Sequence, residues 1–109
     1  SGNRSSAATS GDSSSAATSG NRSSAATSGN YSTATATGGY CSAQVEGKNS
    51  LAIANGAHSK ARGVLGCYLV LTEYADGGKL LWAKIAKVDG TAIKENVWYT
   101  LKNGEFEEV

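Results

Sequence analysis

Residues 1–63 read SGNRSSAAT-SGDSSSAAT-SGNRSSAAT-SGNYSTATA-TGGYCSAQV-EGKNSLAIA-NGAHSKARG, seven nine-residue units in succession without an insertion or deletion. Every unit has glycine at its second place and alanine at its seventh. The glycines are Gly2, Gly11, Gly20, Gly29, Gly38, Gly47 and Gly56, and the alanines are Ala7, Ala16, Ala25, Ala34, Ala43, Ala52 and Ala61. The fifth place is serine in every unit except one, where Cys41 stands. A fixed short period is typical of stacked structural repeats, so we interpret these residues as the structural positions of a repeat array.

Small residues alternate along each unit, as in Ser5, Ala7 and Thr9 at places five, seven and nine. Alternation with a period of two is typical of a β-strand that buries one face. The stretch Ser-Gly-Asn-x between successive strands has glycine followed by Asn or Asp, which favour positive φ and tight reversals. We therefore expect each unit to form one strand and one corner.

The size of the unit determines how many units close one coil of the stack. Nine residues span at most ~30 Å when extended, which is too short for a closed coil with two turns. Three units per coil would leave a central space that alanine and serine cannot fill, and protein interiors are close-packed. We therefore predict an all-β fold, a narrow two-sided β-solenoid with two units per coil and coils ~4.8 Å apart. The columns Ser5/Ser14 and Ala7/Ala16 then face inward, and the inward serines need a partner in the same column or a corner carbonyl.

Residues 64–109 lack the repeat and contain both tryptophans and the only phenylalanine. Residues 64–74 and 79–88 are predicted to pair as a hairpin across Ala75-Asp76-Gly77-Gly78, with a further turn at Asp89-Gly90. Residues 97–101 and 105–109 are predicted to form a second hairpin, because Asn103-Gly104 is a strong local turn signal. Repeat arrays expose an unpaired end that a different module usually covers, so we predict a solenoid over 1–63 and a C-terminal β-hairpin cap over 64–109.

Apolar side chains appear on one outer face only near the end of the array, at Leu51 and Ile53. They indicate that a following element packs against the solenoid there; a binding patch is the alternative. The two cysteines, Cys41 and Cys67, lack the spacing of a ligand pair and are interpreted as buried free thiols. A disulfide between them is the alternative, which requires Cα atoms closer than ~7 Å.

The charge and the motifs exclude several function classes. The formal net charge of the 109 residues is +1 with no basic stripe, which argues against nucleic-acid binding. No apolar run approaches the ~18–20 residues of a membrane helix. The only histidine, His58, is expected at an exposed corner without a catalytic arrangement around it, and no phosphate loop or ligand pair is present. We expect a non-enzymatic chain without cofactor or metal, in which Glu105, Glu107 and Glu108 discourage pairing along a strand edge.

Two stretches together resemble a known group of proteins: EGKNSLAIANGAHSKARG continuing into GVLGCYLVLTE, and KVDGTAIKENVWYTLKNGEFEEV. They are similar to the C-terminal part of phage- and prophage-encoded proteins of unknown function from gut-type bacteria, in which TGNxSxAA repeats run into GALGCWIVLTE and then VDGxxIKxxTxYxLxNGEFxEV. The resemblance covers essentially the whole chain, and departs at Val97, where threonine is usual. It implies phage association, in the phage or the bacterial cytoplasm, and it carries over no activity or site residue. Members generally have a further N-terminal region, and a chain that begins with Ser1 indicates a fragment or processed product.

Three other repeat families share features of this pattern. Calcium-binding nonapeptide rolls need an acidic residue in nearly every corner, and among the third places of the units only Asp12 is acidic. Trimeric adhesin heads use a related SxAxG pattern, which NSLAIANGAHSKA resembles locally, but with a shorter period. Ice-binding solenoids present flat Thr-x-Thr arrays, and Thr33-Ala34-Thr35 has that spacing once.

The functional prediction is therefore a structural or spacer module of a phage-associated protein, with a surface-binding module of the adhesin or ice-binding kind as the alternative. The array begins abruptly with a full repeat at Ser1 to Thr9, so we expect its N-terminal coil to have an unpaired edge; the alternative is that the further N-terminal region covers this end. Such an edge is a template for a second copy, and we expect an end-to-end homodimer about a two-fold axis.

Overall fold

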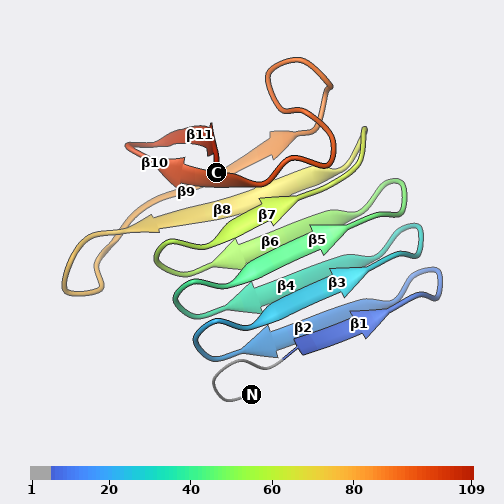
Figure 1. The fold of residues 1–109 in the computed structure, drawn as a ribbon, viewed down its shortest axis with the longest axis horizontal. Coiled ribbons are helices and arrows are strands. Elements are labelled where there is room, and N and C mark those ends of the chain that lie inside the picture. Colours follow the sequence, from blue (N-terminus) through green and yellow to red (C-terminus); the bar gives the residue numbers. More distant parts are fainter. Residues whose placement is uncertain (1–5) are drawn as a thin grey trace.

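The computed structural model describes residues 6–109, which form β-strands joined by turns and contain no helix. The strands are β1 (Ser6–Thr9), β2 (Ser15–Ser19), β3 (Ser24–Thr27), β4 (Thr33–Thr37), β5 (Ser42–Val45), β6 (Leu51–Asn55), β7 (Lys60–Arg62), β8 (Tyr68–Tyr74), β9 (Leu80–Lys87), β10 (Tyr99–Lys102) and β11 (Glu105–Glu108). Strands β1 to β8 alternate between two sheets, as Figure 1 shows. One sheet has the order β1-β3-β5-β7-β10-β11 and the other the order β2-β4-β6-β8-β9.

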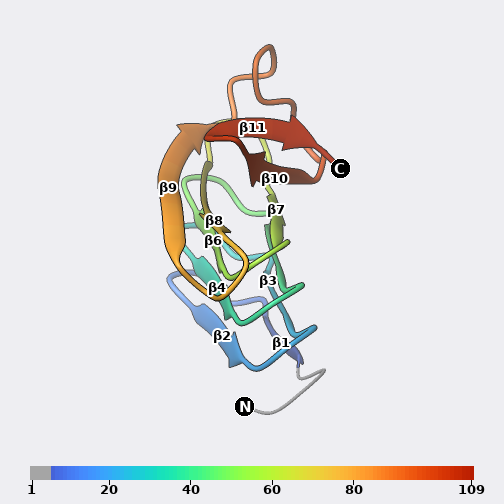
Figure 2. The ribbon, with the colours of Figure 1, turned by 90° about the vertical axis from the view of Figure 1, so that its left-hand side faces the viewer.

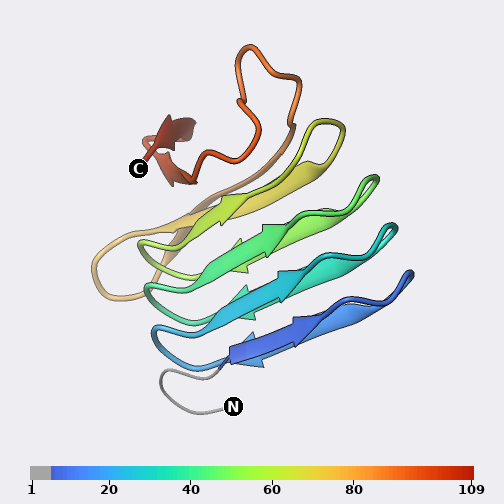
Figure 3. The same cartoon turned by 45° about the vertical axis from the view of Figure 1, so that its right-hand side comes forward.

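The first seven strands pair in parallel with a constant offset of two repeat units. Ser6 pairs with Ser24 and Ser24 with Ser42 in one sheet, and Thr33 pairs with Leu51 in the other. The chain is therefore a β-solenoid with one unit per sheet and two units per coil, and the predicted fold class is confirmed. Figure 3 shows the coils stacked from the N-terminal to the C-terminal end.

The alanines of the seventh place form the middle of the interior. Ala16 is 3% exposed and the later members are at most 1% exposed, whereas Ala7 in the first coil is half-buried. Side chains of this size allow the two sheets to lie close together, and the shortest dimension of the molecule is 17 Å. The predicted inward orientation is confirmed for Ala7, Ala16, Ala25, Ala34, Ala43, Ala52 and Ala61, while Gly2 and Ser5 lie outside the described residues.

The fifth-place hydroxyls bind the coil before them through two hydrogen bonds. Ser32 Oγ donates to the Gly11 carbonyl at 3.4 Å and accepts from the Ser14 amide at 3.3 Å. Cys41 occupies an equivalent place, and its Sγ donates to the Gly20 carbonyl at 3.1 Å. Both predicted kinds of partner, the same column and a corner carbonyl, are thus used.

The corners reverse direction at the fourth place of the unit and not at the glycine. The fourth-place residues have φ between 57° and 60° although none of them is glycine; they are Ser13, Arg22, Tyr31, Tyr40, Asn49 and His58. Of the repeat glycines within residues 6–109, positive φ is found only at Gly20 and Gly38. The expectation that Gly-Asn supplies the positive φ is therefore wrong for most units.

Close contact between coils explains the glycine column instead. A Cβ at Gly29, Gly47 or Gly56 would overlap the carbonyl oxygen of the glycine one coil earlier. Any side chain there would force the coils apart, which the backbone ladder does not allow. Glycine is therefore required for the spacing of the coils.

Strand β8 continues the solenoid beyond the predicted boundary at Gly63. It pairs in parallel with β6, but Leu51 faces Tyr68, so the offset is 17 residues and the corner before β8 is one residue shorter. Cys67 occupies the fifth-place column here, because its Sγ donates to the Gly47 carbonyl at 3.1 Å. The parallel stack thus has about four coils, and the cap begins after β8 (Figure 1).

Both predicted hairpins, β8–β9 and β10–β11, are present, and β9, β10 and β11 form the cap. β9 returns antiparallel along β8, and β10 pairs antiparallel with both β7 and β11. The β10–β11 turn has positive φ at Asn103 and Gly104, as the Asn-Gly signal predicted. Large side chains replace alanine here, and Leu69, Leu71, Tyr99 and Leu101 are buried together. Figure 2 shows β10 and β11 lying across the C-terminal end of the stack.

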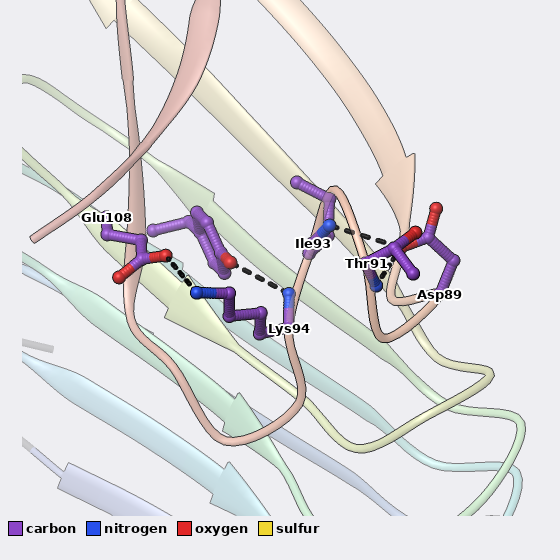
Figure 4. Close-up of polar contacts among 6 residues, drawn as sticks. Asp89, Thr91, Ile93, Lys94 and Glu108 are labelled. Carbon is purple, nitrogen blue, oxygen red and sulfur yellow. Dashed lines mark hydrogen bonds and ion pairs between the residues drawn. The ribbon is translucent and has the colours of Figure 1, made fainter.

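The loop between β9 and β10 is fixed by the carboxylate of Asp89 (Figure 4). Its Oδ1 accepts hydrogen bonds from the amides of Thr91 at 2.9 Å and Ile93 at 3.2 Å. These two backbone hydrogen bonds lower the pKa of Asp89, because they stabilise the charged form. Lys94, which follows Ile93, donates a hydrogen bond from its backbone amide to Tyr99 Oη at 2.8 Å. The loop thereby places Ile93 in the core.

Candidate functional surfaces

The outer face of the sheet containing β6, β8 and β9 carries an apolar patch. Ile53 pairs with Val70 and Val70 with Ile85, while Leu51 pairs with Tyr68 in the neighbouring column. Tyr68 is 40% and Ile85 58% exposed, and the other three are half-buried. We call Leu51, Ile53, Tyr68, Val70 and Ile85 the apolar face.

The strands that follow Leu51 and Ile53 do not cover them. Among residues 6–109, β8 and β9 extend the same sheet sideways, beyond β6. The expectation that a later element packs on this face is therefore wrong, and the alternative interpretation, a binding patch, stays a prediction. The sideways extension explains the half-buried state of these side chains, because each lies beside an apolar neighbour in the next strand.

The same face is rich in hydroxyl groups nearer the N-terminus. Thr33, Thr35 and Thr37 all point outward from β4 and are half-buried, so the Thr-x-Thr pattern is one step longer than the sequence indicated. Thr37 Oγ1 donates to the Thr18 carbonyl at 3.3 Å. Its hydroxyl is thus partly engaged by the solenoid itself.

The outer face of the opposite sheet brings two cations to one indole ring. Lys60 Nζ lies 4.7 Å and Arg62 Cζ 4.9 Å from the centre of the Trp98 ring. Within residues 6–109 the ion pair of the structure is Lys94–Glu108, so neither cation is held by a carboxylate. The three side chains form a small basic and aromatic site.

One corner carries a column of planar side chains. Arg22, Tyr40 and His58 occur at intervals of 18 residues, and each lies at the fourth place of its unit. The Arg22 guanidinium is 5.6 Å from the Tyr40 ring centre, and Tyr40 and His58 are stacked with centres 5.1 Å apart. His58 is exposed as predicted, and its ring is ordered by this column.

The third-place side chains bind the backbone of the next coil. Asp12 Oδ1 accepts from the Asn30 amide at 3.2 Å, and Asn30 Oδ1 accepts from the Lys48 amide at 2.8 Å. Asn21 makes the same contact with Gly39 at 3.1 Å. These oxygens thus tie the corners together. Across the described part of the chain, no group of three or more His, Cys, Asp or Glu side chains is placed to hold a metal ion.

An open groove of about 590 Å³ lies between one corner and the β8–β9 turn. Its polar centre is Asn55 Oδ1, which accepts from Thr72 Oγ1 at 3.1 Å and from Tyr74 Oη at 2.8 Å. Thr72 Oγ1 in turn accepts from the Gly56 amide at 2.9 Å. These groups are engaged with one another and fasten the hairpin to the corner.

The predicted structural residues and the surface side chains therefore lie on different parts of the molecule. The alanines and glycines of the repeat build the interior and the corners, and Cys41 and Cys67 are both buried and free, as predicted. The 18-residue interval between Arg22, Tyr40 and His58 would have predicted their column, whereas the Trp98 site depends on contacts between distant segments.

Comparisons with protein-family models, with curated proteins and with solved structures gave no match. The strands and turns of residues 6–109 include no helix that could span a membrane.

Proposed function

We propose that this chain is a non-enzymatic structural module, a β-solenoid spacer of a phage-associated protein. The observation that carries the proposal is the constant 18-residue register over successive coils. The phage association is supported by the resemblance of the sequence, and the spacer role by the architecture.

Three independent sets of hydrogen bonds support a stiff spacer. The backbone ladder joins each coil to the next, and the fifth-place hydroxyls and the third-place side chains each add a further set. The Ser32–Ser50 and Asn30–Lys48 hydrogen bonds, for example, join residues that lie 18 apart in the sequence, which is one coil. Each further pair of units lengthens such a stack by ~4.8 Å without changing its cross-section. Length is therefore set by the number of repeats.

A change in repeat number tests the spacer role. Duplication of residues 15–32, one complete coil, should keep the fold and lengthen the particle by ~4.8 Å in solution scattering. Duplication of residues 24–27 is the control: four residues are not a whole repeat unit, so the insertion breaks the spacing of strand and corner in that coil and should lower the free energy of unfolding. Equal stability of the two duplications would contradict the proposal.

We also propose self-association through the N-terminal end. Within the described residues β1 and β2 are the first strands of their sheets, with a parallel neighbour on one side only. Small flat side chains at Ala7 and Ala8 suit the approach of a second copy, and an isologous contact closes at a dimer. Light scattering on the wild type and on Ala8→Glu tests this: a wild-type protein that is monomeric at high concentration contradicts it.

A surface-binding module is the second candidate, and the flat face of Thr33, Thr35 and the apolar face favours it. Regular ranks about 4.8 Å apart are the kind of surface that an adhesin or an ice binder presents. Thermal hysteresis and a glycan-binding screen, each with Thr35→Lys as control, test this candidate. Activity that Thr35→Lys abolishes would support binding over the spacer role.

A further inference from the structure

Strand β9 forms a long and uncovered edge of its sheet. It spans Leu80–Lys87 and, among residues 6–109, pairs on one side only, with β8. Leu80, Leu81, Trp82 and Ile85 are between 45% and 58% exposed. Natural edge strands are usually short, charged or covered, because free N–H and C=O groups recruit another strand.

The edge strand of the other sheet shows the contrast. β11 (Glu105–Glu108) is half as long as β9 and carries glutamates at Glu105, Glu107 and Glu108. Its charges discourage pairing, as expected from the sequence. The edge at β9 carries two lysines, Lys84 and Lys87, and no acidic side chain, so the register in which two copies meet decides whether these charges oppose each other.

The phase of the β8–β9 ladder identifies the free backbone groups. The Val88 amide donates to the Cys67 carbonyl at 2.8 Å, which makes this a hydrogen-bonded pair. Such pairs alternate along an antiparallel ladder, so the N–H and C=O groups of Ala83, Ile85 and Lys87 point away from β8. Three residues therefore present a regular free edge.

A β-bulge interrupts the free edge of β9 near its N-terminal end, at Leu81. Glu73 pairs with Trp82 and Tyr74 with Leu80, which leaves Leu81 without a direct partner. A bulge twists the strand and disturbs regular pairing. Regular addition of a strand is thus confined to residues 83–87.

We propose that β9 pairs antiparallel with β9 of a second copy about a two-fold axis through Ile85. In such a pair each residue faces a residue equally far from the axis, so Ile85 faces its own copy. Lys84 then faces Ala86, and Lys87 faces Ala83, so no lysine lies directly opposite a lysine. All three free residues of the edge take part.

The neighbouring registers are less favourable. An axis through Lys84 places Lys84 directly opposite its copy, and like charges in that position are destabilising. An axis through Ala83 pairs Ile85 with Leu81, which lies at the bulge, and places Lys79 opposite Lys87. An axis through Ala86 also opposes no lysines, but it pairs Ala83 with Asp89, beyond the end of β9 at Lys87. The charges and the length of the free edge together therefore favour the register centred on Ile85, in which the edge is complementary to its own copy.

The dimer also extends the apolar face. Ile53, Val70 and Ile85 form one row across β6, β8 and β9. The two-fold axis joins this row to the same row of the second copy, so the exposed side chain of Ile85 becomes the centre of the joint surface. Cross-strand pairs of this kind contribute to sheet stability.

Site-directed cross-linking tests the register. Opposed residues of a hydrogen-bonded antiparallel pair have Cα atoms ~5.5 Å apart, a distance a disulfide spans. Under mild oxidation, Ile85→Cys should form a covalent dimer faster than Thr35→Cys, by on the order of tenfold or more, because pairing raises the local thiol concentration. Cys41 and Cys67 are buried in both proteins.

Solution mass provides an independent test. In an Ala8→Glu background, which blocks the proposed N-terminal contact, the protein should show a concentration-dependent dimer that the added Ile85→Lys abolishes, and circular dichroism should be unchanged because Ile85 is exposed. Ala8→Glu, which is directed at the N-terminal end, should leave the Ile85→Cys cross-link intact, so the two interfaces are distinguishable. Equal cross-linking of Ile85→Cys and Thr35→Cys, or an Ala8→Glu/Ile85→Lys protein that dimerises as Ala8→Glu does, would overturn the proposal.

Discussion

The Sγ of Cys41 donates a hydrogen bond to the carbonyl oxygen of Gly20 at 3.1 Å. One coil later Ser59 Oγ donates to Gly38 at 3.1 Å, so a thiol and a hydroxyl perform the same task in one column. Both side chains are also buried. The column selects for small size and a donor, which explains why one cysteine occurs among the serines.

The first prediction concerns this column. Cys41→Ser should change the free energy of unfolding by less than about 1 kcal/mol, since the hydroxyl replaces the thiol as donor. Ser59→Val should cost about 1–3 kcal/mol, because it leaves the Gly38 carbonyl and the Cys41 amide without their partner. Urea denaturation measures both, and equal losses in the two variants would contradict the proposed role.

The second prediction tests the inward and outward positions. Ala25 is 1% exposed and its neighbour Ser24 is exposed. Ala25→Leu should destabilise by at least about 1–3 kcal/mol through overpacking, whereas Ser24→Leu should be tolerated. Thermal unfolding of the two variants checks this difference.

The third prediction concerns threonines of the ninth place. The Oγ1 atoms of Thr9, Thr18 and Thr27 are buried and, in the described structure, have no hydrogen-bond partner. Thr27→Val keeps the shape and removes the hydroxyl, so it should raise the free energy of unfolding by about 1 kcal/mol. Thr35→Val, on the outer face, is the control and should change it by less than about 0.5 kcal/mol. A destabilised Thr27→Val protein would show that the hydroxyl has a partner.

The interior of the solenoid could be predicted from the sequence because the residues that build it recur at a fixed spacing. Small residues at Ala25 and Ala43 permit two close sheets, and a nine-residue unit is too short to close a coil by itself. The constant offset of 18 residues then follows. The inward columns and the serine contacts were therefore predicted correctly.

The corner conformations and the last coil were not predicted correctly, because the residue types at these positions do not indicate the backbone conformation or the length of the corner. Positive φ falls at Arg22 and Tyr31, which are rare in that conformation and are held there by contacts between coils. β8 was predicted as a strand of the cap and not as part of the solenoid, because the corner before it is one residue shorter. In addition, Leu69 and Leu71 stand where the repeat has alanine and threonine. Gly66 and Cys67 occupy the fourth and fifth places of this last repeat, and this pair could have indicated that the solenoid continues into β8.

The surface site at Trp98 depends on contacts between segments that are far apart in the sequence, which no single repeat unit contains. Trp98 meets Lys60 because β10 pairs with β7, and Tyr99 faces Ala61 in that pairing. A connection across nearly forty residues leaves no short-range pattern. The cap hairpins were predicted from local turn residues, but their position on the solenoid was not.

The fourth prediction concerns pH and the loop of Asp89. Hydrogen bonds from the amides of Thr91 and Ile93 lower the pKa of this carboxyl below its ordinary value, which is about 3.9 in an unfolded chain. A group with a lowered pKa in the folded state stabilises the fold above its unfolded pKa, and this stabilisation is lost as the pH falls through the folded pKa. The wild type should therefore lose more stability between neutral pH and about pH 3 than Asp89→Asn, whose side chain keeps an oxygen acceptor but does not titrate.

The measurement is urea unfolding of the wild type and of Asp89→Asn over this pH range, because the difference removes the contribution of the other carboxylates. At neutral pH the variant should be the less stable of the two, and the two free energies should converge as the acid protonates Asp89. Asp89→Ala removes the acceptor altogether, so it should be less stable than Asp89→Asn at every pH. Release of the loop should also expose Ile93, which the tryptophan fluorescence of the cap can report. Parallel pH curves for wild type and Asp89→Asn would show that the charge of Asp89 contributes nothing to the cap.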